Sequence, residues 1–368
     1  MLANFALASL AMSNATVGDY AWSKIQYTPN STLYPTSPNL PAFTIPSPDL
    51  SCIISSIAED RVSVTVPGGF NAVSLMHRGG SGGARYRFNA GSWTTLALSG
   101  SNALEVKALT GLPTTCSFLG KIVGTTLTVL SVTSGAISTG MEVKGPGIEP
   151  GTTISSGSGT TWTVSIAQNV RTNFLFAGAN MTMDIEVVSG TCELYGADIR
   201  NGASGIRWNK CAMAGTRADH HLAALAADRR RAYTQLASDL VLLMLGTNDR
   251  YVFNAATFAG YMSSLADDHR AATPNADLVL ISPPENLATG TSNSMVDLAY
   301  ALRTVADTKH CGHRDLQPDF GLTVADYGDS GTRYFTTTDA NTRIHPSTPE
   351  GDAVVGSAMD DIVFGGTA

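Results

Sequence analysis

The chain has 368 residues, 14% of them charged, and a formal net charge of −7. This length predicts two or three domains whose cores need neither disulfides nor metals. The acidic balance leaves no basic footprint, so we expect no nucleic-acid partner. Without a run of eighteen apolar residues we also expect no membrane span.

The cysteines are odd in number and lie far apart, which predicts no disulfide framework and no zinc site. The stretch HCGH at 310–313 places two histidines near a cysteine, but a second cluster with metal-ligand spacing is missing. We interpret it as the C-terminus of a helix, where histidines interact favourably with the dipole. No metal is expected. The cysteines are Cys52, Cys116, Cys192, Cys211 and Cys311.

The N-terminal fifty residues fall into two parts. Residues 1–12 are apolar but lack a basic start and a clear cleavage site, so we expect a buried strand or helix rather than a signal peptide. Residues 27–50 hold six prolines among Ser, Thr and Asn, which predicts an extended, non-helical connection.

Short alternating runs between 60 and 115 predict β-strands that are separated by glycine turns. RVSVTV at 61–66 is one of them, and the same texture returns at 174–196, where MTMDIEVV alternates apolar and polar residues. We therefore expect one antiparallel sandwich or jelly roll, of a carbohydrate-binding-like type, from residues 51–117 together with 172–196.

The segment between these two halves, residues 118–171, predicts a small β module of its own. Gly, Thr and Ser punctuate β-branched runs, and helix signals are almost absent. Its pattern G-T-T-L-T-V, then G-P-G-I-E-P-G-T-T-I, then T-V-S resembles small β modules of bacteriophage virion proteins. The alternative interpretation is a generic β insertion in a secreted protein.

After residue 196 helical and fully apolar segments alternate, which predicts parallel α/β layers. In such sheets ligands bind at the carboxyl ends of the strands. We expect strands at 241–246, 276–282 and 321–327, and helices at 221–240, 255–272, 294–310 and 350–364.

The strand at 241–246 runs into Gly246-Thr247-Asn248-Asp249 and is preceded by Asp239-Leu240-Val241. This run resembles the third motif of the SGNH (GDSL-like) hydrolases, a superfamily of esterases and deacetylases, in which D-L-V-x-x-x-x-G-x-N-D closes a buried strand. The resemblance implies a three-layer, flavodoxin-like α/β domain over 197–368. Residues 1–50 would supply its first strand, and the sandwich with its inserted module would interrupt it.

Two other stretches fit further motifs of this superfamily. Gly215, in AGTR at 214–217, matches the glycine of the second motif, with Gly205 as the alternative. His345, in RIHP at 343–346, matches the histidine that precedes the last helix.

The resemblance implies acyl transfer to a serine hydroxyl, with His345 as the base that removes its proton. The tetrahedral intermediate would place its oxyanion against the serine N–H, the Gly215 N–H and the side-chain amide of Asn248. Asp249 would cap the following turn or helix. Gly246 would border the pocket.

Two features depart from the superfamily pattern. Thr342 occupies the place of the histidine-orienting Asp, and the nearest acid is Asp339, six residues before His345. Residues 5–24 lack Gly-Asp-Ser, and the register there suggests Ser13 as the nucleophile. A literal Gly-Asp-Ser ends at Ser330, but it follows the last expected strand, so a turn is the simpler interpretation.

The resemblance implies an esterase that removes O-acetyl groups from a host surface polysaccharide, as part of a phage tail or surface appendage, or else as a secreted protein. Other virion proteins would be partners, and the chain could also form a homo-oligomer. The alternative is a catalytically degenerate fold that binds glycan or builds the virion. A flavodoxin-like cofactor domain is not expected, because a phosphate loop is missing. We therefore expect no cofactor.

Overall fold

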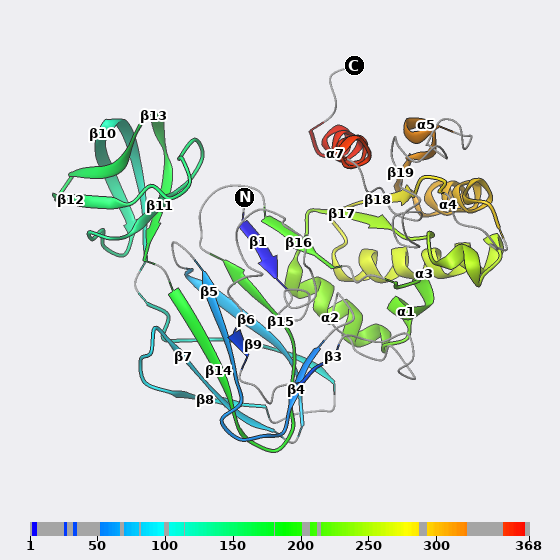
Figure 1. Cartoon of the computed structure of the whole chain (residues 1–368), viewed down its shortest axis with the longest axis horizontal. Coiled ribbons are helices and arrows are strands. Elements are labelled where there is room, and N and C mark those ends of the chain that lie inside the picture. The colour runs from blue at the N-terminus through cyan, green and yellow to red at the C-terminus, as the bar shows by residue number, and fades with distance from the viewer. Residues whose placement is uncertain are drawn as a thin grey trace. The chain divides into compact units, whose positions relative to one another are not determined.

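The structure is a computed structural model, and the chain divides into two units, residues 1–41 with 45–213 and residues 42–44 with 214–368 (Figure 1). Each unit is described here by itself. The structure describes residues 2–5, 26–27, 32–34, 52–66, 70–80, 82–98, 103–113, 115–179, 181–200, 207–211, 215–286, 293–321 and 349–364.

The first unit contains two sheets that share one hydrophobic core. Sheet A has the order β16-β1-β15-β4-β3, with β6 between β15 and β9, and sheet B has the order β2-β5-β14-β7-β8. Sheet A comprises β1 (Leu2–Phe5), β3 (Thr32–Tyr34), β4 (Cys52–Ser55), β6 (Ala72–Arg78), β9 (Leu104–Ala108), β15 (Cys192–Arg200) and β16 (Arg207–Lys210). Sheet B comprises β2 (Gln26–Tyr27), β5 (Arg61–Val66), β7 (Gly83–Phe88), β8 (Thr94–Ala97) and β14 (Met181–Ser189).

Alternation of side chains along the strands creates this core. In β7, the sequence GARYRF buries Ala84, Tyr86 and Phe88 and leaves Arg85 and Arg87 on the opposite face, as the period of two in a strand requires. The described strand pairs in sheets A and B are antiparallel except one. Strand β1 runs parallel to β16, from Leu2 opposite Arg207 to Phe5 opposite Lys210.

The inserted module forms sheet C from β10 (Cys116–Ser134), β11 (Glu142–Lys144), β12 (Ile154–Ser158) and β13 (Thr161–Gly178). It has a separate hydrophobic core, which includes Phe118, Leu127 and Val164. Register shifts interrupt the long β10–β13 pairing after Gly120 and after Gly124. The domain boundaries expected from the sequence remain a prediction.

The second unit contains a parallel sheet D of β17 (Leu240–Met244), β18 (Asp277–Ser282) and β19 (Gly312–Asp315), with β18 in the middle. One face packs Leu278 and Leu280 against α3 and α4, and the other packs Ile281 against α5 and α7 (Figure 1). The helices are α1 (Ala218–Leu222), α2 (Ala226–Leu236), α3 (Ala255–Ala272), α4 (Met295–Lys309), α5 (Gln317–Phe320) and α7 (Pro349–Phe364), with a 3-10 turn η3 (Asp249–Tyr251).

The fold is therefore mixed α/β, with one parallel sheet and several antiparallel sheets, as expected. Two elements differ from the prediction. The helix expected at 221–240 is two helices, because Leu225 is extended at φ −59° and ψ 133° between α1 and α2. The strand β19 was not expected, and most of the strand expected at 321–327 lies outside the described residues.

The described helices include none that is long and apolar enough to cross a membrane.

Candidate active site

The Gly-Thr-Asn-Asp motif lies directly after the carboxyl end of β17. Gly246 has φ +132°, a value that residues with a side chain rarely adopt. Its carbonyl accepts a hydrogen bond from Arg250 N at 3.1 Å. The chain thereby turns sharply out of the strand into η3. This turn explains the glycine in the motif, and it places Asn248 at the sheet edge where parallel α/β folds bind ligands.

The side chain of Asn248 points to the loop of the second motif. Its Nδ2 donates to the carbonyl of Thr216 at 3.0 Å. Gly215, the residue before, is exposed and has φ +77°, which favours glycine. An amide nitrogen has two hydrogens, and within the described part of the chain Nδ2 of Asn248 donates only to Thr216 O. The second hydrogen can therefore donate to a ligand.

A second bond joins the same two segments. Oδ1 of Asp249 accepts from the N–H of Ala218, the first residue of α1, at 2.8 Å. The carboxyl is fully buried, and burial raises its pKa to about 6, although backbone hydrogen bonds from Ala218 and Gly246 oppose the shift. An acceptor at this position also suits the positive end of the helix.

This contact corrects the expected role of Asp249. We expected it to cap the following turn or helix, but its side chain caps α1, which precedes it by 31 residues. The following helix α3 is capped by Asn254, whose side chain accepts from Thr257 N at 2.8 Å. A capping partner from another motif is set by tertiary packing, so the local sequence could not reveal it.

Arg250 directly follows the Gly-Thr-Asn-Asp motif, and its side chain is buried. It is 3% exposed and forms an ion pair with Glu285, which follows β18. The Glu285 carboxylate also accepts from Met295 N, the first residue of α4, at 3.1 Å. A paired buried charge of this kind costs several kcal/mol to break. The pair therefore fixes the turn after β17 to the turn after β18, and the sequence analysis did not identify it.

Arg217 lies between Gly215 and α1. Its Nε and Nη2 each donate to the Asp219 carboxylate at 3.0 Å, and its guanidinium lies 5.5 Å from the ring centroid of Phe253. The Arg217 side chain is 25% exposed to solvent. The guanidinium of Arg217 is therefore fixed by Asp219 but accessible to solvent, and it lies next to the loop that Asn248 contacts.

The remaining residues expected in the site lie outside the described residues. These are Ser13, Ser330, Asp339 and His345, and the alternative glycine Gly205 lies there too. The structure thus brings together Asn248, Asp249 and the Gly215–Thr216 loop. The expected nucleophile, base and orienting acid stay predictions.

A serine–histidine pair that the sequence analysis did not identify lies at the end of β18. Ser282 Oγ is 2.9 Å from His313 Nε2, and burial lowers the pKa of this histidine. Ser282 is only 1% exposed. A hydroxyl so enclosed cannot meet a polysaccharide, so we assign the pair a structural role between β18 and β19.

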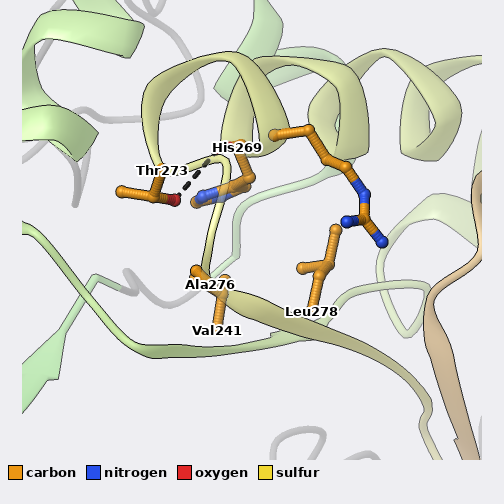
Figure 2. Close-up of a pocket in the computed structure, with 6 residues that line it drawn as sticks. Val241, His269, Thr273, Ala276 and Leu278 are labelled. Carbon is orange, nitrogen blue, oxygen red and sulfur yellow. Dashed lines mark hydrogen bonds between the residues drawn. The ribbon is translucent and has the colours of Figure 1, made fainter.

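A small pocket lies where β17 and β18 begin, at the end of these strands opposite the Gly-Thr-Asn-Asp turn. Figure 2 shows the residues that line it. Its lining includes Val241 and Leu278, the second residues of β17 and β18, and His269 of α3. The space between these side chains is about 150 Å³ with open solvent included, and it leaves essentially no room for a water-sized molecule. We therefore do not assign this pocket to the site.

The HCGH stretch is split between two elements. His310 is the C-cap of α4, in the left-handed conformation at φ +52°, whereas His313 lies in β19. Within the described part of the chain, no group of three His, Cys, Asp or Glu side chains is placed to hold a metal ion.

No protein-family model and no curated protein matches this sequence. Solved structures do match. A peptidoglycan O-acetylesterase aligns with 96% of this chain and 81% of its own, at a TM-score of 0.51 and 15% identity. The fold is SGNH-like. At this identity the likeness establishes the SGNH-like fold and leaves the activity open.

Two carbohydrate esterases are similar over smaller parts. Est24, a carbohydrate acetylesterase from Sinorhizobium meliloti, covers 45% of this chain and 79% of its own, with 18% identity and a TM-score of 0.31. Axe2, an acetylxylan esterase from Geobacillus stearothermophilus, covers 43% and 71%, with 16% identity and a TM-score of 0.32. These likenesses are too distant to bear further on the SGNH-like fold.

Proposed function

We propose that the chain is a serine esterase that removes O-acetyl groups from a polysaccharide. The observation that supports this most is the hydrogen bond from Asn248 to Thr216, which places a side-chain amide on the loop after Gly215. The bond from Ala218 to Asp249 fixes the same two segments again. The alignment with a peptidoglycan O-acetylesterase over 96% of the chain supports acetyl as the acyl group.

In the proposed reaction the serine Oγ attacks the carbonyl carbon of the ester, and His345 takes the hydroxyl proton. The carbonyl oxygen becomes an oxyanion, which the Asn248 amide and the Gly215 N–H stabilise. Collapse breaks the bond to the sugar oxygen, which receives the proton from His345. Water then attacks the acetyl-serine, again with His345 as base. The bond from the acetyl carbon to the serine Oγ breaks, Oγ takes the proton back from His345, and acetate leaves.

The nucleophile in this proposal is Ser13, with Ser330 as the alternative, and Asp339 orients His345. Thr342 occupies the place of the usual acid. Loss of the orienting Asp costs about 10⁴ in kcat in a serine triad. We therefore expect slow turnover if Asp339 does not reach the histidine.

The proposed setting is a phage tail or surface appendage, and otherwise secretion. Its support is the resemblance of residues 120–170 to modules of bacteriophage virion proteins. The substrate would then be a host surface polysaccharide. Other virion proteins, or further copies of the chain, would be partners.

A second function is favoured by a specific observation. Residues 5–24 lack Gly-Asp-Ser, and Thr342 replaces the orienting acid. A chain that had lost hydrolysis could still bind glycan or serve as a structural virion protein. This alternative keeps the same fold but needs no nucleophile.

Labelling with a fluorophosphonate, which reacts with activated serines, tests the proposal. We expect one label per chain on the peptide that contains Ser13, lost in Ser13→Ala and kept in Ser330→Ala. Ser282→Ala is the matched control, because that serine also has a histidine partner but is buried. Label at Ser330 would retain the esterase and overturn Ser13. No label and no acetate release, with polysaccharide binding retained, would support the alternative.

A further inference from the structure

Three arginines surround one tryptophan on the outer face of sheet B. The guanidinium carbons of Arg61, Arg85 and Arg87 lie 5.2, 4.7 and 4.3 Å from the ring centroid of Trp93. Their side chains are 35%, 38% and 21% exposed to solvent, respectively. We call these four residues the Trp93 patch. Attraction between the cations and the ring holds its members together.

Two carboxylates of β14 accept hydrogen bonds from the three arginines. Glu186 accepts from Arg61 Nε at 3.0 Å and from Arg85 Nε at 2.7 Å, and Asp184 accepts from Arg87 Nε at 2.7 Å. Burial alone would raise the pKa of Glu186, but the bonds from Arg61 and Arg85 lower it. Three guanidiniums therefore face two carboxylates, so the patch together with Glu186 and Asp184 carries one net positive charge on a chain of net charge −7.

The loop that presents Trp93 is fixed in an unfavourable backbone conformation. Asn89 and Ala90 have φ +50° and +57°, which is uncommon for residues other than glycine. Asn89 is held by two bonds to Thr182, from Asn89 N to Thr182 O at 2.9 Å and from Thr182 N to Asn89 Oδ1 at 2.7 Å. Such conformations persist where surrounding structure imposes them, and they concentrate at functional sites.

We propose that the Trp93 patch binds a carboxylate-bearing sugar of an anionic polysaccharide. The apolar face of the sugar would pack on the indole of Trp93, and its carboxylate would accept hydrogen bonds from Arg85 and Arg87. Arginine suits this role because its planar fork matches a carboxylate. The proposal stands whether or not the chain hydrolyses esters.

The hydrogen-bond inventory of the two arginines leaves donors for such a ligand. A guanidinium has five N–H donors. Arg85 donates from Nε and Nη2 to Glu186, and Arg87 donates from Nε to Asp184. The residues on either side of Trp93, two in the loop and two at the start of β8, are small and exposed, so they leave room for a sugar. They are Gly91, Ser92, Thr94 and Thr95.

A patch that only stabilises the sheet would show the same contacts, so the test must measure binding. Titration calorimetry at 0.15 M salt would compare oligogalacturonate, which has one carboxylate on each sugar, with a neutral galactan oligosaccharide of equal length. We expect binding of oligogalacturonate only. No binding, or equal binding of the neutral oligosaccharide, would overturn the proposal.

Two variants locate the binding. Arg85→Gln leaves Glu186 paired with Arg61, so the buried carboxylate keeps a partner. Trp93→Leu removes the aromatic ring. We expect each to weaken binding about 10-fold, in line with the loss of one charged contact or one stacking surface. If Trp93→Leu does not fold, as judged by its thermal transition, Arg85→Gln decides the test.

Arg171→Gln is the matched control, because Arg171 is an exposed arginine of β13 in the inserted module. It removes the same charge at a different place and should bind as the wild type does. Equal loss of binding in Arg171→Gln and Arg85→Gln would show that only net charge matters and would overturn the site. Binding of dextran sulfate as tight as that of oligogalacturonate would overturn the preference for carboxylate.

Discussion

Asn248 lies in the turn after β17, and one hydrogen of its side-chain amide is bonded to the Thr216 carbonyl while the other is available to a ligand. In the proposed reaction that second hydrogen stabilises the oxyanion, whose charge develops in the transition state and is absent from the bound ester. Asn248→Ala should therefore lower kcat for p-nitrophenyl acetate about 10²–10³-fold, with little change in KM.

The control for this variant is Asn169→Ala, which removes an exposed asparagine from the inserted module. It should leave kcat unchanged. A wild-type kcat in Asn248→Ala, with the thermal transition also unchanged, would mean that the Asn248 amide does not take part in the reaction.

Asp249 affects stability through its proton. Its folded pKa is about 6, against an ordinary value of 3.8, because the carboxyl is buried. As the pH rises from about 4 to about 6, the unfolded chain ionises this group while the folded chain still holds the proton. This group therefore contributes a loss of stability as the pH rises.

Asp249→Asn removes that pH-dependent contribution. The stability of the variant relative to the wild type should rise between pH 4 and pH 6, by up to about 3 kcal/mol. Urea denaturation of both proteins at four pH values would measure the difference. A difference that does not change with pH would show that the folded and unfolded carboxyls titrate alike.

At the scale of elements, buried polar groups join α1, α2 and α3. Arg229 of α2 forms an ion pair with Asp268 of α3, and Tyr233 of α2 stacks on His269 of α3 with ring centroids 3.9 Å apart. His221 of α1 lies close enough to His269 and Arg229 for their charges to lower its pKa, although burial is the larger cause. These helices therefore share a cluster of buried polar groups that includes two histidines.

Acid should loosen these three helices. Burial lowers the pKa of both His221 and His269 to about 4, from 6.5. As the pH falls from about 6.5 toward 4, the unfolded chain gains protons that the folded chain does not bind, so stability is lost. His269→Gln should reduce this loss by up to about 3 kcal/mol. Urea denaturation midpoints at pH 7, 5.5 and 4.5 would measure this loss of stability in the wild type and the variant. An equal change of the midpoint with pH in the two proteins would contradict the expectation.

Helix α4 depends on its N-terminal capping box. Ser294 Oγ accepts from Asp297 N at 3.1 Å, and Asp297 Oδ2 accepts from Ser294 N at 3.3 Å. Ser294→Ala should destabilise the protein by about 0.5–2 kcal/mol in urea denaturation. Thr304→Ala, at an exposed position inside the same helix, should be neutral or slightly stabilising. Equal effects of the two substitutions would contradict a capping role for Ser294.

For the whole molecule, periodicity predicted the larger elements of the second unit. The expected helices at 255–272 and 294–310 agree with α3 and α4, and the expected strand at 276–282 agrees with β18. The two helices are long segments with a capping residue, Asn254 or Ser294, and β18 is a short apolar run. Local pattern is sufficient there because burial and propensity favour the same state.

Two features of the molecule were beyond the reach of local pattern. Strand β19 has the sequence GHRD, which contains no large apolar residue, and only its pairing with β18 makes it a strand. The break between α1 and α2 contains neither glycine nor proline. In both cases tertiary contacts decide a structure that propensity leaves open.

The candidate site divides in the same way. The Gly-Thr-Asn-Asp motif predicted Asn248 at a strand end, because a turn after a buried strand has a local signature. The bonds from Asn248 to Thr216 and from Ala218 to Asp249 join segments about thirty residues apart, and only the fold brings them together. His345 rests on its motif alone, and Ser13 rests on the register of residues 5–24, which lack the motif.

In the proposed reaction a serine and His345 complete the site around Asn248. The most direct test is the rate of acetate release from an O-acetylated polysaccharide by the wild-type chain, Ser13→Ala and His345→Ala. We expect measurable release by the wild type and a loss of about 10³-fold or more in each variant. Wild-type rates in both variants, or no release by the wild type, would contradict the account.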